Sequence, residues 1–95
     1  MAKKVNFKVP VTGLDGKVIE ERGKKLWINE ILSNMISVAR PQTNSTIKQL
    51  DLALKIYNSE TEIEIDDEAK EIIKKVVEQG QASVLVAGQI LKLVE

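Results

Sequence analysis

The chain has 95 residues, of which 43% are hydrophobic and 29% are charged, and its formal net charge is zero. This balance is typical of a globular domain and argues against disorder, so we expect a single domain over residues 1–95. Cysteine and histidine are absent from the sequence, which excludes disulfide bonds, the usual zinc sites, and nucleophilic catalysis by Cys/His or Ser/His pairs.

Charge is spread unevenly along the sequence. Residues 1–25 carry seven basic side chains against three acidic ones, whereas residues 59–71 carry seven acidic side chains against one lysine. Such an asymmetry can steer a partner or self-association; the alternative is that both clusters are simply solvated faces. No apolar run approaches the roughly 20 residues that a membrane helix needs, and no apolar leader follows the first lysines, so we expect a cytoplasmic protein without membrane contact.

The N-terminal part is predicted to form a β-hairpin. Residues 5–11 alternate between apolar and polar side chains, which is the pattern of a strand with one buried face. Asp15 and Gly16 favour a two-residue turn, because both residue types tolerate positive φ. We therefore expect a hairpin over residues 5–20, followed by a polar link at residues 22–25.

Two helices are predicted next. Between residues 28 and 39, apolar side chains recur every three or four positions, and Pro41 ends this helix. A second helix runs to Tyr57. Leu52 and Ile56 widen its apolar arc, so we expect this helix to be covered on more than one side. Its inward face is predicted to consist of Ile47, Leu50, Ala53, Leu54 and Tyr57.

The second half of the chain adds a strand and two more helices. Residues 61–65 alternate again and predict a short strand. Asp66 is a natural N-cap for the third helix, Gly80 is a natural residue to follow it, and Ser83 can cap the last helix. The fold class is therefore predicted to be α+β, with an N-terminal β-hairpin, four helices, and a short third strand before the third helix.

The last helix differs from the others, because apolar side chains cover most of its circumference. A domain of this size can hardly enclose a helix fully, so we expect a homo-oligomer, or contact with another protein. Close packing of this helix on the hairpin is the alternative. The predicted interface consists of Val84, Val86, Ala87, Ile90, Leu91 and Val94.

The basic N-terminal region suggests a second kind of partner. Its lysines and arginine could follow the phosphates of a nucleic acid, and Trp27 could stack on a base. Aromatic residues make up only 3% of the chain, and its net charge is zero, so nucleic-acid binding is the weaker alternative. The predicted contact residues are Lys17, Arg22, Lys24, Lys25 and Trp27.

The acidic run of residues 60–71 fits surface structure better than it fits a metal site or a catalytic site. A calcium loop needs ligands at set offsets around a glycine, and a catalytic carboxyl needs an apolar pocket; neither pattern is present. The acids fit the outer face of a strand and the first turn of a helix instead. We therefore expect no catalytic residue, no metal ligand and no cofactor.

Three segments of the chain resemble small phage and prophage proteins of about this length. They are residues 11–17 (VTGLDGK), 52–57 (LALKIY) and 85–91 (LVAGQIL). The chain departs from the family pattern at Trp27, where a Ser or Thr helix cap is expected, and in the loop at Pro41. The resemblance implies a bacterial or phage cytoplasmic setting and no catalytic residues. Together with the apolar last helix, it predicts a non-enzymatic interaction or regulatory protein that binds itself or a host or phage protein.

Overall fold

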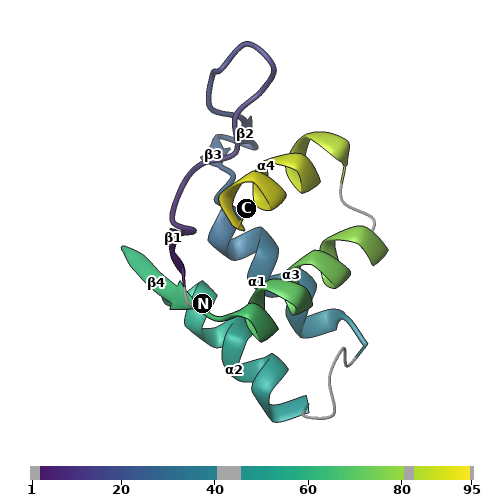
Figure 1. Ribbon diagram of the computed structural model, residues 1–95. Helices are drawn as coiled ribbons and strands as arrows, with labels where there is room; N and C mark the ends of the chain where they lie inside the picture. The colour runs from purple at the N-terminus through teal and green to yellow at the C-terminus, as the bar shows by residue number, and fades with distance from the viewer. Residues whose placement is uncertain (1–2, 41–45, 81–82, 95) are drawn as a thin grey trace.

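The computed structural model describes residues 3–40, 46–80 and 83–94. Within these ranges the fold is α+β, as predicted, with four helices and two small antiparallel sheets (Figure 1). The elements in chain order are β1 (Lys3–Asn6), β2 (Glu20–Glu21), β3 (Lys24–Lys25), α1 (Ile28–Val38), α2 (Thr46–Tyr57), β4 (Glu62–Ile65), α3 (Asp67–Gln79) and α4 (Val84–Val94). The first helix ends three residues before Pro41, which itself lies outside the described residues.

The first strand has a different partner from the one expected. β1 pairs antiparallel with β4, so it joins the predicted third strand and not residues 17–20. Val5 is buried, whereas Lys4 and Glu64 lie opposite each other and are exposed. Alternation identifies the buried face of a strand but not the strand beside it, which is why the sequence pattern missed this pairing.

The predicted hairpin is present but short, and its turn differs from the prediction. The Gly13 N–H donates to the Lys17 carbonyl (2.9 Å), and the Gly16 N–H donates to the Gly13 carbonyl (3.0 Å). Gly16 has a φ of 80°, whereas Asp15 keeps a negative φ and accepts a hydrogen bond from the Lys17 N–H (3.0 Å). The loop therefore has three residues, a type I turn followed by a left-handed glycine, and not two.

Residues 22–25, predicted as a polar link, belong to a second hairpin. β2 pairs with β3 in an antiparallel ladder that places each glutamate opposite a lysine. Arg22 and Gly23 form the turn with φ values of 54° and 78°. Positive φ at both positions is the signature of a type I′ turn, which matches the twist of the flanking strands.

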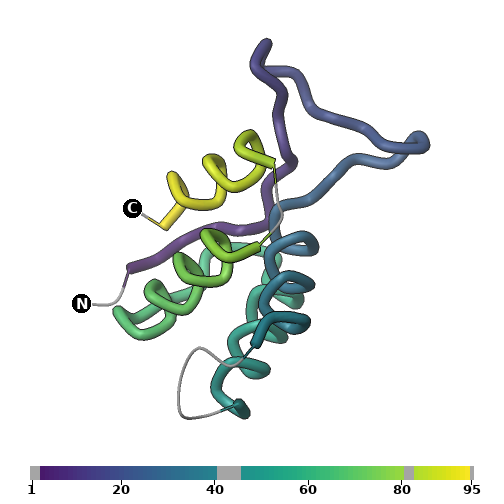
Figure 2. Tube along the Cα trace, turned by 90° about the vertical axis from the view of Figure 1, so that its right-hand side faces the viewer, coloured from purple at the N-terminus to yellow at the C-terminus, as the bar shows by residue number. Residues whose placement is uncertain are grey.

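A closed ring of three backbone hydrogen bonds joins the two hairpins. The Val11 N–H donates to the Leu26 carbonyl (2.8 Å), the Leu26 N–H donates to the Ile19 carbonyl (3.2 Å), and the Ile19 N–H donates to the Val11 carbonyl (2.9 Å). Val11 is fully buried at this junction. Beyond the ring, residues 12–25 project from the body with one corner at each turn (Figure 2). We call this segment the forked loop.

α1 and α2 pack antiparallel and are joined at both ends by buried amides. Gln49 Nε2 donates to the carbonyls of Ile36 (3.3 Å) and Arg40 (3.2 Å). At the other end, Asn29 Nδ2 donates to the Tyr57 carbonyl (3.1 Å). Both amide side chains are buried. Backbone carbonyls thus accept from both amide nitrogens, whereas Asn29 Oδ1 is buried without a hydrogen-bond partner among the described residues.

The inward face of α2 is not the predicted one. Of the five residues expected to face the core, Ala53 alone is buried, and the other four are exposed. The buried residues of this helix are Gln49, Leu52, Ala53 and Ile56. Periodicity could not choose between the two arcs, because both carry large apolar side chains. The hydrogen bonds of Gln49 to the Ile36 and Arg40 carbonyls hold the arc with Leu52 and Ile56 inward.

α3 begins as predicted and ends at the predicted residue for a different reason. Asp66 is the N-cap, and its Oδ1 accepts a hydrogen bond from the Ala69 N–H (2.8 Å). Gly80 follows the helix with a φ of −76°, so it is not in the left-handed conformation that favours glycine there. A β-carbon at Gly80 would lie 2.9 Å from Met35 Cε and 2.9 Å from the Val76 carbonyl oxygen. Glycine therefore permits close packing of α3 against α1.

Candidate interaction surfaces

The interface predicted on α4 is largely covered by the chain itself. Ile90 and Val94 are fully buried in the core, so neither can meet a partner directly. At the other extreme, Val84 is 90% exposed at the start of the helix. The remaining members of the predicted set are half-buried against the core: Val86, Ala87 and Leu91.

The N-terminal segment packs against α4. The Gln89 carboxamide pairs with the backbone of Thr12: Oε1 accepts from its N–H (3.0 Å), and Nε2 donates to its carbonyl (2.5 Å). Ser83 caps the helix as predicted, accepting a hydrogen bond from the Val86 N–H (3.3 Å). Packing on the N-terminal segment, the alternative given above, therefore accounts for part of the apolar circumference of α4.

The predicted nucleic-acid contacts lie on the forked loop, with one exception. Four of them are exposed along it, and we call these the basic tip residues: Lys17, Arg22, Lys24 and Lys25. The β2–β3 ladder places a glutamate directly opposite each of its two lysines. Opposite charges at this spacing cancel much of the local positive field.

Trp27, the fifth predicted contact, lies at the base of the forked loop and not on it. It is half-buried at the N-cap of α1, and Lys8 Nζ lies 4.9 Å from its ring centroid. This is cation–π distance, so the lysine occupies one face of the indole that a base would stack on. The exposed large apolar residues of the loop are Leu14, at the first turn, and Val18.

Most acids of the run lie on β4 or at the start of α3. Glu62 and Glu64 are exposed on β4, and Asp66 caps α3. Asp67 and Glu68 stand in the first turn of α3, where the helix dipole favours negative charge. Among the residues that the structure describes, no group of three carboxylates is placed to hold a metal ion.

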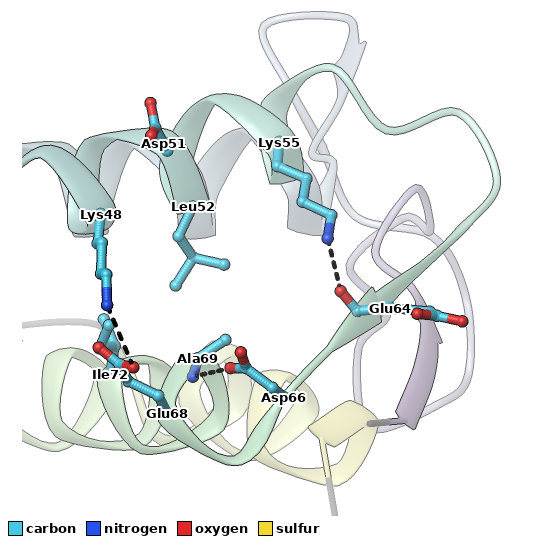
Figure 3. Close-up of a pocket in the computed structure, with 9 residues that line it drawn as sticks. All are labelled: Lys48, Asp51, Leu52, Lys55, Glu64, Asp66, Glu68, Ala69 and Ile72. Carbon is cyan, nitrogen blue, oxygen red and sulfur yellow. Dashed lines mark hydrogen bonds and ion pairs between the residues drawn. The ribbon is translucent and has the colours of Figure 1, made fainter. Parts of the chain in front are cut away.

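A charged cleft of about 260 Å³ separates α2 from the junction of β4 and α3 (Figure 3). Lys55 Nζ donates to the Glu64 carbonyl (2.7 Å), and Lys48 Nζ lies 3.9 Å from Glu68 Oε2. Figure 3 shows both lysines reaching into the cleft, whereas Asp51 points away from it. The cleft floor is apolar and consists of Leu52, Ala69 and Ile72. The two lysines thus tie α2 to the acidic segment.

The largest group of exposed apolar side chains lies on the outer face of α2. Ile47 is 72% exposed, Leu50 51%, Leu54 49% and Tyr57 56%. Their spacing of three or four residues places them in one line along the helix. We call this line the α2 stripe. The sequence pattern had identified these side chains as apolar but had assigned them to the core.

A groove of about 190 Å³ runs along the α2 stripe, between α2 and α1. Its apolar wall is formed by Leu50, Leu54 and Tyr57, and its opposite border by Glu30, Ser33, Asn34 and Ser37 of α1. An apolar wall with a polar border is the usual form of a surface that receives a helix or another protein. Val84 stands singly, which is ordinary for a protein surface, whereas Val38 lines a separate hollow with Met35 and Val76.

No helix within residues 3–40, 46–80 and 83–94 is long and apolar enough to cross a membrane. Comparison of the chain with protein-family models, with curated proteins and with solved structures found no match.

Proposed function

We propose that this chain is a non-enzymatic interaction protein whose contact surface is the α2 stripe with its groove. The observation that carries the proposal is the alignment of four large apolar side chains, each about half exposed or more, on one helix face. The largest apolar patch of a monomer usually measures about 300–600 Å² and is often functional. An exposed apolar stripe contributes nothing to the stability of the folded chain. A partner that covers the stripe removes apolar surface from water, which favours binding.

Nucleic-acid binding is the alternative, and the geometry favours it less. The basic tip residues are accessible, but glutamates oppose two of them, and Lys8 covers one face of Trp27. A phage or prophage origin and a cytoplasmic location also belong to the proposal. The support for the origin is the resemblance of residues 11–17, 52–57 and 85–91.

Site-specific photo-cross-linking in the natural host tests the proposal. A photoreactive amino acid replaces Leu50 in one variant and Lys75, an exposed residue of α3, in the matched control. We expect a covalent adduct of discrete mass from position 50, abolished when Leu54 is also changed to glutamate, and no such adduct from position 75. Equal labelling from both positions, or none from position 50, would refute the α2 stripe as a contact surface.

A further inference from the structure

We infer that Asp15, at the first turn of the forked loop, is a site of spontaneous isoaspartate formation. The reaction passes through a succinimide ring that the Asp15 carboxyl closes with the backbone nitrogen of Gly16. This inference concerns the forked loop alone and is independent of the α2 stripe.

The residue after an aspartate decides how easily such a ring closes. Its backbone nitrogen must reach the aspartate Cγ, and a side chain on that residue hinders the approach. Gly16 has no side chain, and no heavy atom of the described residues lies within 4 Å of the position that a β-carbon would occupy there. Glycine also gives the backbone more conformational freedom than any other residue. Ring closure at Asp15 is therefore sterically open.

The turn directs the Asp15 carboxyl toward the backbone that follows it. Asp15 Oδ1 accepts a hydrogen bond from the Lys17 N–H (3.0 Å), so the side chain folds over the two peptide units between these residues. The Gly16 nitrogen belongs to the first of the two units. The carboxyl thus starts on the correct side of the chain, and a rotation within the turn brings Cγ to the nitrogen.

Little structure opposes that rotation. The Gly16 N–H donates to the Gly13 carbonyl (3.0 Å), and this bond must break because the nitrogen loses its proton on ring closure. Asp15 and Gly16 are both exposed, and the forked loop projects from the body (Figure 2). A projecting loop that few hydrogen bonds hold can open locally at a free-energy cost well below that of global unfolding.

The other three aspartates of the sequence occupy helical positions and serve as internal controls. Asp51 lies in the middle of α2, Asp66 is the N-cap of α3, and Asp67 is in the first turn of α3. Each is followed by a residue with a side chain, in a regular helix that restricts backbone rotation. The fold therefore places the reaction at Asp15.

The chemistry needs no co-reactant besides water. The Gly16 nitrogen attacks Cγ of the protonated carboxyl, so that a C–N bond forms, a C–O bond breaks, and the amide proton leaves with the hydroxyl as water. Water then adds to one of the two ring carbonyls. Addition at the former side-chain carbonyl restores aspartate. Addition at the former backbone carbonyl leaves the chain running through the Asp15 β-carbon, with unchanged mass and one extra backbone carbon.

The extra carbon alters the first turn and leaves the body intact. A hydrogen bond from the Gly13 N–H to the Lys17 carbonyl (2.9 Å) closes the three-residue loop, whose geometry depends on its exact length. The ring of hydrogen bonds at Val11 lies below this turn and holds the base of the forked loop. The modification therefore changes the tip of the loop without unfolding the domain.

Peptide mapping of the aged chain tests the inference. The folded full chain is incubated at neutral pH and physiological temperature and then digested with trypsin, which releases residues 9–17. We expect this peptide to separate into two species of equal mass, of which protein isoaspartyl methyltransferase methylates the new one. The peptides that contain Asp51, Asp66 and Asp67 should each remain a single species that the enzyme does not methylate.

Two variants provide matched controls. Asp15→Glu keeps the charge but adds a methylene, which disfavours the five-membered ring, so its peptide should give no second species. Asp15→Asn keeps the acceptor for the Lys17 N–H and has ammonia as its leaving group, so it should react at least tenfold faster, with the mass gain of deamidation. The helical circular dichroism of the natural chain should be the same before and after ageing.

Two results would overturn the inference. If Asp15 stays unmodified in the folded chain while a synthetic peptide of residues 9–17 isomerises, the fold protects the turn. If Asp51 isomerises as fast as Asp15, the forked loop holds no special site.

Discussion

Two alanine substitutions on the same helix test which face of α2 is buried. Ile56 is fully buried, whereas Leu54, two residues earlier, is 49% exposed. Removing a buried isoleucine side chain costs about 2–5 kcal/mol, through lost burial and the cavity left behind. Removing a half-exposed leucine should cost about 1 kcal/mol or less, because water already covers much of it. A domain of this size has a total stability of about 5–14 kcal/mol, so Ile56→Ala should remove a large share of it.

Thermal unfolding followed by circular dichroism measures both effects. For a chain of this size, 1 kcal/mol lowers Tm by about 4–8 °C, so Ile56→Ala should lower it by roughly 10 °C or more, and Leu54→Ala by clearly less. The samples are kept dilute, so that self-association does not contribute to stability. If Leu54→Ala proves the more costly change, α2 presents its other arc to solvent. The α2 stripe would then be core, and the contact surface proposed above would not exist.

Three further outcomes are expected. Gly80→Ala should destabilise the fold by about 1–3 kcal/mol, because the added β-carbon would crowd α1 and the end of α3. Gly88→Ala should stabilise the fold by roughly 1 kcal/mol in thermal unfolding, because no heavy atom of the described residues lies within 4 Å of the added β-carbon and alanine favours the helix. Gln89→Ala should cost about 1–3 kcal/mol by leaving the backbone groups of Thr12 unpaired, and should speed hydrogen exchange of the Thr12 amide; unchanged exchange would contradict the contact. Alanine at all four basic tip residues should leave low-salt gel shifts with DNA and RNA unchanged from those of the natural chain, and a shift that only the natural chain gives would support nucleic-acid binding instead.

Local rules predicted those parts of the fold that depend on neighbouring residues. The N-cap of α3 at Asp66 and the cap of α4 at Ser83 both come from side chains within a few positions of the backbone groups they serve. Such signals can be read from sequence because the chain need not fold back to complete them.

Long-range choices were not predictable in the same way. The antiparallel partner of β1 is β4, more than fifty residues away, and no local pattern records that pairing. The turn at Gly16 closes a three-residue loop, because the ring of hydrogen bonds at Val11 sets the register of the hairpin. In both cases contacts with distant segments decided between structures that the local sequence permits equally.

The contact surface proposed from the structure lies on a different helix from the one predicted from the sequence. An excess of apolar surface suggested a contact, and the last helix seemed the obvious source, but the N-terminal segment and the core cover most of α4. The two apolar arcs of α2 were visible in the sequence, with Leu52 and Ile56 on one and Leu50 and Leu54 on the other. Which arc faces outward depends on buried hydrogen bonds of Gln49 to α1, which only the folded chain reveals.

Amide chemical shifts recorded across a dilution series of the isotope-labelled chain test the α2 contact surface most directly. We expect concentration-dependent shifts at residues 47–57 and along the α1 border of the groove, with α4 and the forked loop unchanged. Shifts confined to α4, or to the forked loop, would contradict the assignment of contact to α2. A spectrum that does not change at any concentration would exclude self-association through this surface and leave contact with another protein to the cross-linking experiment.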